Sequence, residues 1–273
     1  HAREGVLMAA APAFELRGVT VEVNGRPVLR DLDLTIARGE RLVLLGVNGC
    51  GKSTLMRVLD GLAFATRGEV RFEGERLDAR ALEDAEFRRR FRSAVGLLFQ
   101  NVDAMVFNPT VADEIAFGPR QLGIPDVDAR VARWADALDV TALADRPPFE
   151  LSGGEKKRVG LAAVLAMHPR ALLLDEATAN MDPAAQARLV DLLAGLEGVT
   201  IVASTHNLSI ASELGTRAVL LHPRGEGVLF DGSPERLLGN EPLLVRSGLA
   251  HRHQHRHGGA AHVHAHYHVH DSE

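Results

Sequence analysis

The stretch GVNGCGKST (46–54) constrains the fold of this chain more than any other, because spaced glycines precede a lysine and two hydroxyl residues. Its spacing fits G-x-x-x-x-G-K-[ST], in which backbone N–H groups turn inward around phosphate oxygens. The apolar run GERLVLLG (39–46) before it is typical of a strand buried on both faces, and STLMRVLDGL (53–62) after it has a helical pattern. Strand, loop and helix together predict a phosphate-binding loop at the positive end of a helix.

The residue types in this loop indicate how it would hold a nucleotide. Lys52 is placed to reach the β- and γ-phosphates, and the Ser53 hydroxyl is placed to occupy a Mg²⁺ position. The residues that we assign to nucleotide binding are Asn48, Gly49, Gly51, Lys52, Ser53 and Thr54.

Strands and helices alternate in the later part of the chain. ALLLDE (171–176) reads as a second buried strand, and a helix (183–196), the strand VTIVAST (199–205), another helix and the strand RAVLLH (217–222) follow. This alternation implies an α/β fold with a parallel sheet that is covered on both faces. Ligands of such sheets bind at the carboxyl ends of the strands.

Two further segments depart from this alternation. FELRGVTVEV (14–23) and RPVLRDLDLTI (26–36) flank Asn-Gly, so they predict two strands around a turn. The stretch from about 101 to 165 is largely helical, which favours an inserted helical subdomain. Trp134 falls on the apolar face of an amphipathic helix there, so we interpret it as a core residue.

The strand at 171–176 ends in two acids that suit phosphate chemistry. Asp175 can coordinate Mg²⁺ directly or through water. Glu176 points differently and can orient and deprotonate an attacking water.

The signature segment, LSGGEKKRV (151–159), is a candidate for a second anion site. Ser152, Gly153 and Gly154 precede a helix, so they offer a hydroxyl and free N–H groups at its positive end. The same residues would also make an ordinary helix cap with two turn glycines.

Five ordered motifs together resemble the ATPase subunit of ABC transporters: GVNGCGKST, a lone Gln100 after GLLF, LSGGEKKRV, LLLDEATANMDP and STHNL. The resemblance covers about residues 14 to 235. It implies a P-loop NTPase (RecA-like) α/β core with an N-terminal antiparallel β-subdomain and an inserted helical subdomain. ATP and Mg²⁺ are the ligands that it implies.

The resemblance also implies roles for single residues. Gln100 would touch Mg²⁺ and the attacking water, His206 would contact the γ-phosphate, and Asp182 would lie in a loop that signals between two sites. Ser152, Gly153 and Gly154 would bind ATP held by the P-loop of a partner. The implied partners are therefore a second ATPase subunit and transmembrane transporter subunits at the cytoplasmic face of the membrane. We expect a homodimer, and pairing with a paralogue is the alternative.

A finer resemblance points to one branch of this family. FQNVDAMVFNPTVADEIAFGPRQLG (99–123) and the EKKR of the signature segment are similar to the ATPase of energy-coupling-factor importers, in the cobalt and nickel branch. The chain also departs from the family pattern. Val23 replaces the usual adenine-stacking aromatic residue, Ala177 replaces a proline, and 102–105 differs from the Pro-Asp-Asp-Gln of close relatives.

Bulk properties and missing motifs narrow the alternatives. A formal charge of −5 argues against a nucleic-acid partner, and no apolar run approaches the ~20 residues of a membrane-spanning helix. A P-loop nickel metallochaperone is one alternative, but its guanine-reading N-K-x-D motif is missing from the sequence. A soluble ABC ATPase outside transport is the other alternative, and repair relatives would insert a long coiled coil that has no counterpart here.

The segment HRHQHRHGGAAHVHAHYHVH (251–270) contains nine of the 13 histidines, at every second position of two runs. At this period the histidines of each run would share one face of an extended strand. The GGAA between the runs could let them converge on Co²⁺ or Ni²⁺, and a disordered tail that binds metal only incidentally is the alternative. The candidate ligands are His251, His253, His255, His257, His262, His264, His266, His268 and His270.

The expected organisation of the chain has three parts. Residues 1–13 would form a disordered or vector-derived extension, 14–235 would form the ATPase domain, and 236–273 would form a histidine-rich tail.

Overall fold

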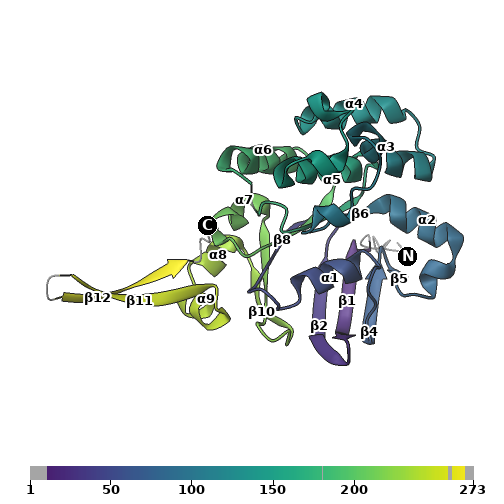
Figure 1. Ribbon diagram of the computed structural model, residues 1–273. Coiled ribbons are helices and arrows are strands. Elements are labelled where there is room, and N and C mark those ends of the chain that lie inside the picture. The colour runs from purple at the N-terminus through teal and green to yellow at the C-terminus, as the bar shows by residue number, and fades with distance from the viewer. Residues whose placement is uncertain (1–10, 180, 258–259, 268–273) are drawn as a thin grey trace, which may run out of the picture.

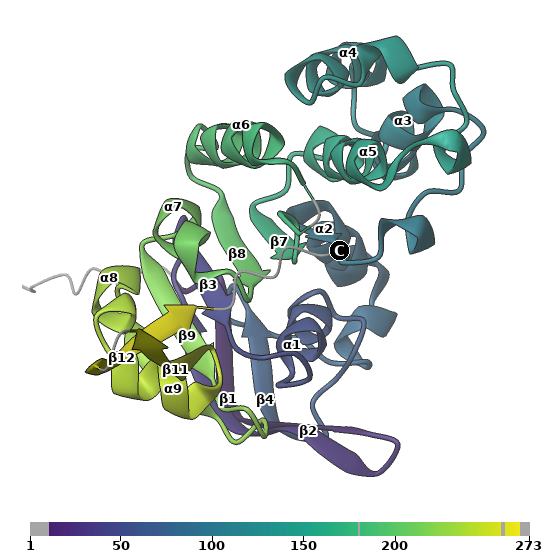
Figure 2. The same ribbon diagram turned by 60° about the vertical axis from the view of Figure 1, so that its left-hand side comes forward.

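The computed structural model describes residues 11–179, 181–257 and 260–267, and from residue 251 onward it describes the backbone alone. Residues 1–10 of the expected extension, and His268 and His270 of the tail, lie outside the described residues. Figures 1 and 2 show two sheets side by side, a group of helices above them and a hairpin that projects from the body.

The N-terminal part forms the expected antiparallel sheet. Its strands, in the spatial order β2-β1-β4-β5, are β1 (Phe14–Val23), β2 (Arg26–Ile36), β4 (Arg67–Phe72) and β5 (Glu75–Arg76). Asn24 and Gly25 join β1 to β2 with positive φ angles of 51° and 71°, which these two residues tolerate. Phe14, Leu16 and Val19 of β1 are buried in the core between this sheet and the second one.

The second sheet is the parallel core. Its strands, in the order β10-β9-β3-β8-β7-β6, are β3 (Arg41–Leu45), β6 (Val95–Leu98), β7 (Ala171–Asp175), β8 (Thr200–Thr205), β9 (Arg217–Leu221) and β10 (Val228–Gly232). Each neighbouring pair is parallel except β9 and β10. Because β8 lies between β3 and β7, the segments that follow these three strands meet at the carboxyl edge of the sheet.

Both faces of the parallel sheet are covered, which explains why its strands are continuously apolar. The helices that cover it are α1 (Lys52–Leu59), α2 (Ala85–Ala94), α5 (Gly153–Ala166), α6 (Pro183–Ala194) and α7 (Ala211–Leu214). Leu42 and Leu44 of β3 belong to a core with β1, α1 and α2. Val43 and Leu45 belong to a second core, on the opposite face, with α5, α6 and α7.

The inserted helical subdomain consists of α3 (Val111–Leu122), α4 (Val127–Ala137) and α5, which pack against one another. Trp134 on α4 is buried as expected, with its ring edge-on to His168 at 6.3 Å. Within the part of the chain that the structure describes, no helix is long and apolar enough to cross a membrane.

The sequence analysis did not identify α2. This helix is rich in arginine, and only Phe87, Phe91 and Ala94 are buried, so its apolar stripe is too narrow to stand out. Its start is fixed by Asp84, whose side chain accepts a hydrogen bond from the Phe87 N–H at 2.7 Å.

The packed domain continues beyond residue 235, where we expected it to end. The helices α8 (Pro234–Leu238) and α9 (Glu241–Ser247) bury Leu237 and Leu244 against the core, and Leu249 is buried after them. The strands β11 (Ala250–His257) and β12 (Ala260–Tyr267) follow as an antiparallel hairpin. Because these leucines are part of the hydrophobic core, the folded domain reaches about residue 250.

Asp60 is a buried carboxyl at the end of α1 and is 7% exposed. Arg92 Nη1 donates to the Asp60 carbonyl at 2.7 Å and lies 3.3 Å from Asp60 Oδ2. Burial raises the pKa of Asp60 to about 7, although the charge of Arg92 acts in the opposite direction. The folded state therefore holds a proton on Asp60 more tightly than the unfolded chain does.

This raised pKa predicts a pH-dependent effect of Asp60→Asn on stability. The contribution of Asp60 is fully present below about pH 4 and is lost as the pH rises through about 7, because the folded pKa exceeds the ordinary value of 3.8. The melting temperature of the variant minus that of the wild type should therefore increase from pH 5 to pH 8 in thermal denaturation. Asp191→Asn, at an exposed position of α6, is the control, and an equal pH dependence in both variants would contradict the expectation.

Candidate functional site

A cavity of about 280 Å³ opens at the carboxyl edge of the parallel sheet. The residues that line it are Val28, Asn48, Gly49, Gly51, Lys52, Ser53, Thr54, Gln100 and Glu176. All six residues assigned to nucleotide binding, together with Gln100 and Glu176, are thus brought to one cavity. Ser152, Gly153 and Gly154 do not line it.

The loop that opens the cavity owes its shape to Gly46 and Cys50. Gly46 has a φ of 151°, and a Cβ at this position would lie 2.5 Å from Cys50 Sγ, so only glycine fits. Cys50 is fully buried, and burial raises the pKa of its thiol. A thiol with a raised pKa is a poor nucleophile, so Cys50 acts as a small packing residue of the loop.

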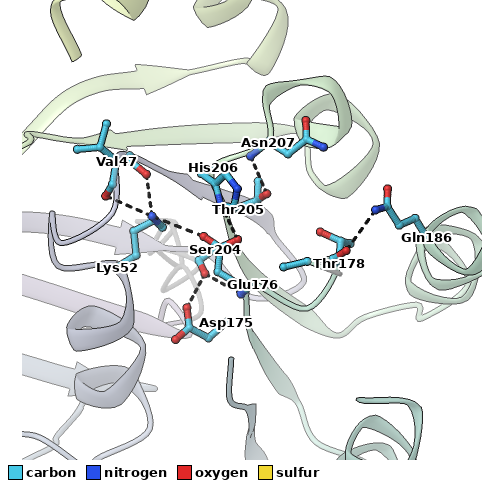
Figure 3. A network of polar contacts seen from close by, with 12 residues as sticks. Val47, Lys52, Asp175, Glu176, Thr178, Gln186, Ser204, Thr205, His206 and Asn207 are labelled. Atoms are coloured by element: carbon cyan, nitrogen blue, oxygen red, sulfur yellow. Dashed lines mark hydrogen bonds and ion pairs between the residues drawn. The ribbon is translucent and has the colours of Figure 1, made fainter. Parts of the chain in front are cut away.

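Lys52, at the start of α1, is held at the centre of this loop (Figure 3). Its Nζ donates to the carbonyls of Gly46 at 2.7 Å and Val47 at 3.4 Å, and it lies 3.6 Å from Glu176 Oε1. Lys52 is only 6% exposed, so its charge acts in a setting with little solvent screening. The loop thus presents a fixed positive charge to its cavity.

Asp175 and Glu176 stand at the end of β7 and are joined through Ser204 on β8. The Ser204 hydroxyl donates to Asp175 Oδ1 at 2.6 Å and accepts from the Glu176 N–H at 3.0 Å. Glu176 has a φ of 50°, an uncommon conformation for glutamate, which turns its side chain out of the strand register. Sequence reasoning missed Ser204, although a hydroxyl inside a buried strand (199–205) was a signal that could have identified it.

The carboxylate of Glu176 is 4% exposed and has different partners at its two oxygens. Oε2 lies 3.0 Å from Nδ1 of His206, which follows β8, so these two predicted residues are adjacent (Figure 3). Among the described side chains, Oε1 has no hydrogen-bond partner, and its neighbour is Lys52 at 3.6 Å. Buried polar atoms normally have partners, so Oε1 is an acceptor in place for a water.

Lys157 connects the signature segment to this site. Its Nζ donates to the backbone carbonyls of Glu176 at 3.2 Å and of Ala179. Burial lowers the pKa of Lys157, and the charge of Glu176 opposes this effect. Sequence reasoning assigned no role to Lys157, because a lysine pair after a helix start reads as solvated surface.

The signature residues begin α5 in an open position. Ser152 is its N-cap, and the Glu155 carboxylate accepts from the Ser152 N–H at 2.8 Å and from its hydroxyl at 2.7 Å. A Cβ added at Gly153 or Gly154 would meet no atom within 4 Å. The structure therefore keeps these residues away from the cavity of their own chain and leaves space above their backbone.

Two further residues that the sequence analysis singled out, Asp182 and Val23, lie at the start of α6 and at the end of β1. Asp182 is the N-cap of α6 and accepts from the Ala185 N–H at 2.8 Å. The side chain of Gln186 donates to the carbonyls of Thr178 and Met181, which ties the segment before α6 to that helix (Figure 3). Val23, at the end of β1, is exposed.

The donor set around the cavity suits Mg²⁺. Ser53 and Gln100 line the cavity, and Asp175 stands beside Glu176 at the end of β7 without lining it. These three residues offer hydroxyl, amide and carboxylate oxygens, which are the ligand types of this cation. Among the described side chains, no group of three or more His, Cys, Asp and Glu residues could hold a metal ion. Mg²⁺ is usually held by one or two carboxylates together with phosphates and water.

The geometry predicts that Glu176→Gln strongly lowers the rate of nucleotide turnover. The substitution keeps the shape of the side chain and removes the proton acceptor, so kcat for ATP should fall by about 10²- to 10⁴-fold. Nucleotide affinity, measured by equilibrium binding, should stay within about threefold. Glu213→Gln, at an exposed position of α7, is the control, and wild-type turnover in Glu176→Gln would exclude Glu176 as the base.

The contacts of Lys157 predict that it positions Glu176. Lys157→Met should lower kcat about tenfold and leave nucleotide affinity unchanged, because the turn that holds Glu176 would lose an anchor. Lys156→Met is the matched control on the same helix, since Lys156 pairs with exposed Asp103. Steady-state kinetics should also show partial rescue by Lys157→Arg, and equal effects of the two methionine variants would refute this role.

Comparisons with known proteins agree with this geometry. The family model described as "ABC transporter" matches residues 29–179. The nickel import ATP-binding protein NikO of Rhodobacter capsulatus is 43% identical over 245 residues, which cover 87% of this chain and 96% of that protein. The energy-coupling factor transporter ATP-binding protein EcfA of Methanothermobacter thermautotrophicus is 38% identical over 241 residues, with coverages of 86% and 76%.

A solved structure has the same fold. CbiO1 from Clostridium perfringens, part of the ABC transporter complex CbiONQ, has a TM-score of 0.72 and 27% identity, and the match covers 88% of this chain and 95% of that one. The expected P-loop α/β fold and the expected enzyme class, an ATPase coupled to transport, are confirmed. The chain belongs to the ABC transporter family, as one of its ATP-binding subunits.

Proposed function

We propose that this chain hydrolyses ATP to power an importer of a divalent transition metal, with cobalt and nickel as the candidate cargoes. The observation that carries the proposal is the buried Oε1 of Glu176, which has no hydrogen-bond partner among the described residues and lies 3.6 Å from Lys52 Nζ, beside the cavity that the phosphate-binding loop lines. The similarity to a protein named for nickel import supports the choice of cargo.

Different residues of the site would bind phosphate, accept a proton from water and bind Mg²⁺. The loop N–H groups and Lys52 would bind the β- and γ-phosphates, and the positive end of α1 adds to this attraction. Glu176 Oε1 would take a proton from the attacking water, while His206 holds Oε2. Ser53, Gln100 and Asp175 would hold Mg²⁺, which neutralises phosphate charge when it is bound.

A second copy of the chain would complete each site. Ser152, Gly153 and Gly154 lie outside the cavity and have open space above their backbone, so they are free to bind ATP held by another subunit. Because one chain carries both half-sites, the phosphate-binding loop and the signature segment, two copies can form a symmetric, head-to-tail pair, and the proposal is therefore a homodimer.

The transmembrane partner would bind the groove between the core and the helical subdomain. The groove has a volume of about 440 Å³ and includes the aromatic side chains of Phe99, Phe107 and Phe117. Phe107 is 67% exposed and Phe117 is 38% exposed, with their rings edge-to-face at 4.9 Å. Exposed apolar surface of this kind marks an interaction site, and docking there would hold the chain at the cytoplasmic face of the membrane.

Buried Glu114 gives this groove a fixed wall. Its Oε2 accepts from the backbone N–H groups of Phe107 and Asn108, both at 2.8 Å, so the loop that carries Phe107 is bound to α3. An ordered aromatic surface loses little entropy on binding. An exposed, ordered aromatic groove fits an ATPase that works with a protein partner. Co-purification with transmembrane subunits would distinguish transport from a soluble role.

The double variant Phe107→Ser/Phe117→Ser tests the partner and the cargo. Basal ATP hydrolysis of the purified chain should stay within about twofold, whereas co-purification with transmembrane subunits and uptake of radiolabelled Ni²⁺ or Co²⁺ by cells should be lost. Phe64→Ser, outside the groove, is the control. Unchanged co-purification would refute docking in this groove, and wild-type cells that take up neither metal would refute the cargo.

A further inference from the structure

The histidine-rich hairpin pairs histidine with histidine across its two strands. In the antiparallel register of β11 and β12, His251 lies opposite His266, His253 opposite His264, and His255 opposite His262. A shift of this register by one residue would place these histidines opposite residues of other types, whereas a shift by two residues would again pair histidine with histidine. The pairing therefore requires the two histidine runs to alternate in phase, and the observed register brings them into phase.

All six paired histidines occupy one face of the hairpin. Directly opposite residues of an antiparallel pair share a face, and every second residue of a strand returns to it. The intervening register positions, which pair Arg252 with Ala265, Gln254 with Val263 and Arg256 with Ala261, occupy the other face. The hairpin thus has one face of histidine and one face of mixed composition.

The spacing of these positions matches metal coordination by imidazole. Opposite Cβ atoms lie about 4.5–5.5 Å apart, and successive pairs are about 6.6 Å apart along the strands. Four imidazole ligands are a sufficient set for a tetrahedral first-row metal ion, and two adjacent pairs place four histidines at neighbouring positions of one face. Neutral imidazole is available for this at physiological pH.

From this register we infer that the face of the hairpin that carries the three cross-strand histidine pairs binds a divalent first-row transition-metal ion. Imidazole suits Ni²⁺, Co²⁺, Zn²⁺ and Cu²⁺ and does not suit Mg²⁺ or Ca²⁺, which prefer oxygen. Among the side chains that the structure describes, no other group of three or more His, Cys, Asp and Glu residues could take such an ion. The hairpin site goes beyond the proposed function, because binding requires neither ATP nor a membrane partner.

The hairpin is well placed to carry a separate site. It projects from the body, as Figure 1 shows. Its first strand starts from an anchored position, because Leu249 and Ala250 are buried and β11 packs beside α9. ATP hydrolysis measured in the same variants reports on the nucleotide site separately from metal binding.

The test is metal binding by the purified full chain, with Ni²⁺ alone and Co²⁺ alone as probes. Isothermal titration should give a tight site for both ions in the wild type, and bound Co²⁺ should show the intense visible absorption of tetrahedral nitrogen coordination. His253→Gln/His264→Gln removes the central pair and should weaken binding at least tenfold. Arg252→Gln/Arg256→Gln, on the other face, should bind like the wild type.

A positional exchange separates register from composition. Val263→His/His264→Val keeps the number of histidines and breaks the central pair, so it should also weaken binding at least tenfold. Binding equal to the wild type in this variant would overturn the proposal in favour of incidental binding by a histidine-rich tail. Unchanged ATP hydrolysis in every variant verifies that the domain is folded, and failure of the metal site would leave the proposed ATPase function intact.

Discussion

A carboxylate buried as deeply as that of Glu176 is costly unless charged and polar groups from its surroundings offset the loss of water. Here those groups come from separate segments: Lys52 from the phosphate-binding loop, His206 after β8, and Lys157 from α5. Satisfying this one side chain and its backbone therefore fixes the loop, the sheet edge and the first turns of the signature helix relative to one another. Ser204 adds the bond that keeps the end of β7 aligned with β8. The arrangement acts as one electrostatic unit rather than as a set of independent motifs.

The same helix that supports this unit offers its other end to a partner. Lys157 anchors α5 to the turn that contains Glu176, while Ser152 and the following glycines stand at its open N-terminus. In the proposed pair, nucleotide bound by one chain would contact the N-terminus of a helix whose Lys157 donates a hydrogen bond to the backbone of Glu176 in the other chain. Such a connection would let each half of the pair respond to the nucleotide state of its neighbour.

Local pattern was sufficient for much of this architecture, and tertiary packing decided the rest. The strand, loop and helix around Lys52 follow from periodicity and glycine spacing, and the acids after a buried strand predicted Glu176. The roles of Ser204 and Lys157 could not be predicted from the sequence, because they depend on which strand lies beside β7 and on where α5 passes. The sequence did not predict that the domain extends to about residue 250, because a few leucines in short helices carry too little periodicity to indicate burial. The family resemblance supplied the roles of Gln100 and His206, which residue types alone leave open.

The C-terminal end of the domain lies close to the phosphate-binding loop. Gly248 closes α9 with a φ of 79°, and a Cβ there would lie 3.2 Å from Cγ1 of Val47, inside the phosphate-binding loop. Val47 is also the residue whose carbonyl accepts from Lys52. The C-terminal end of α9 therefore packs closely against the phosphate-binding loop. A side chain at position 248 would press on the loop segment whose carbonyl helps to hold the Lys52 ammonium group.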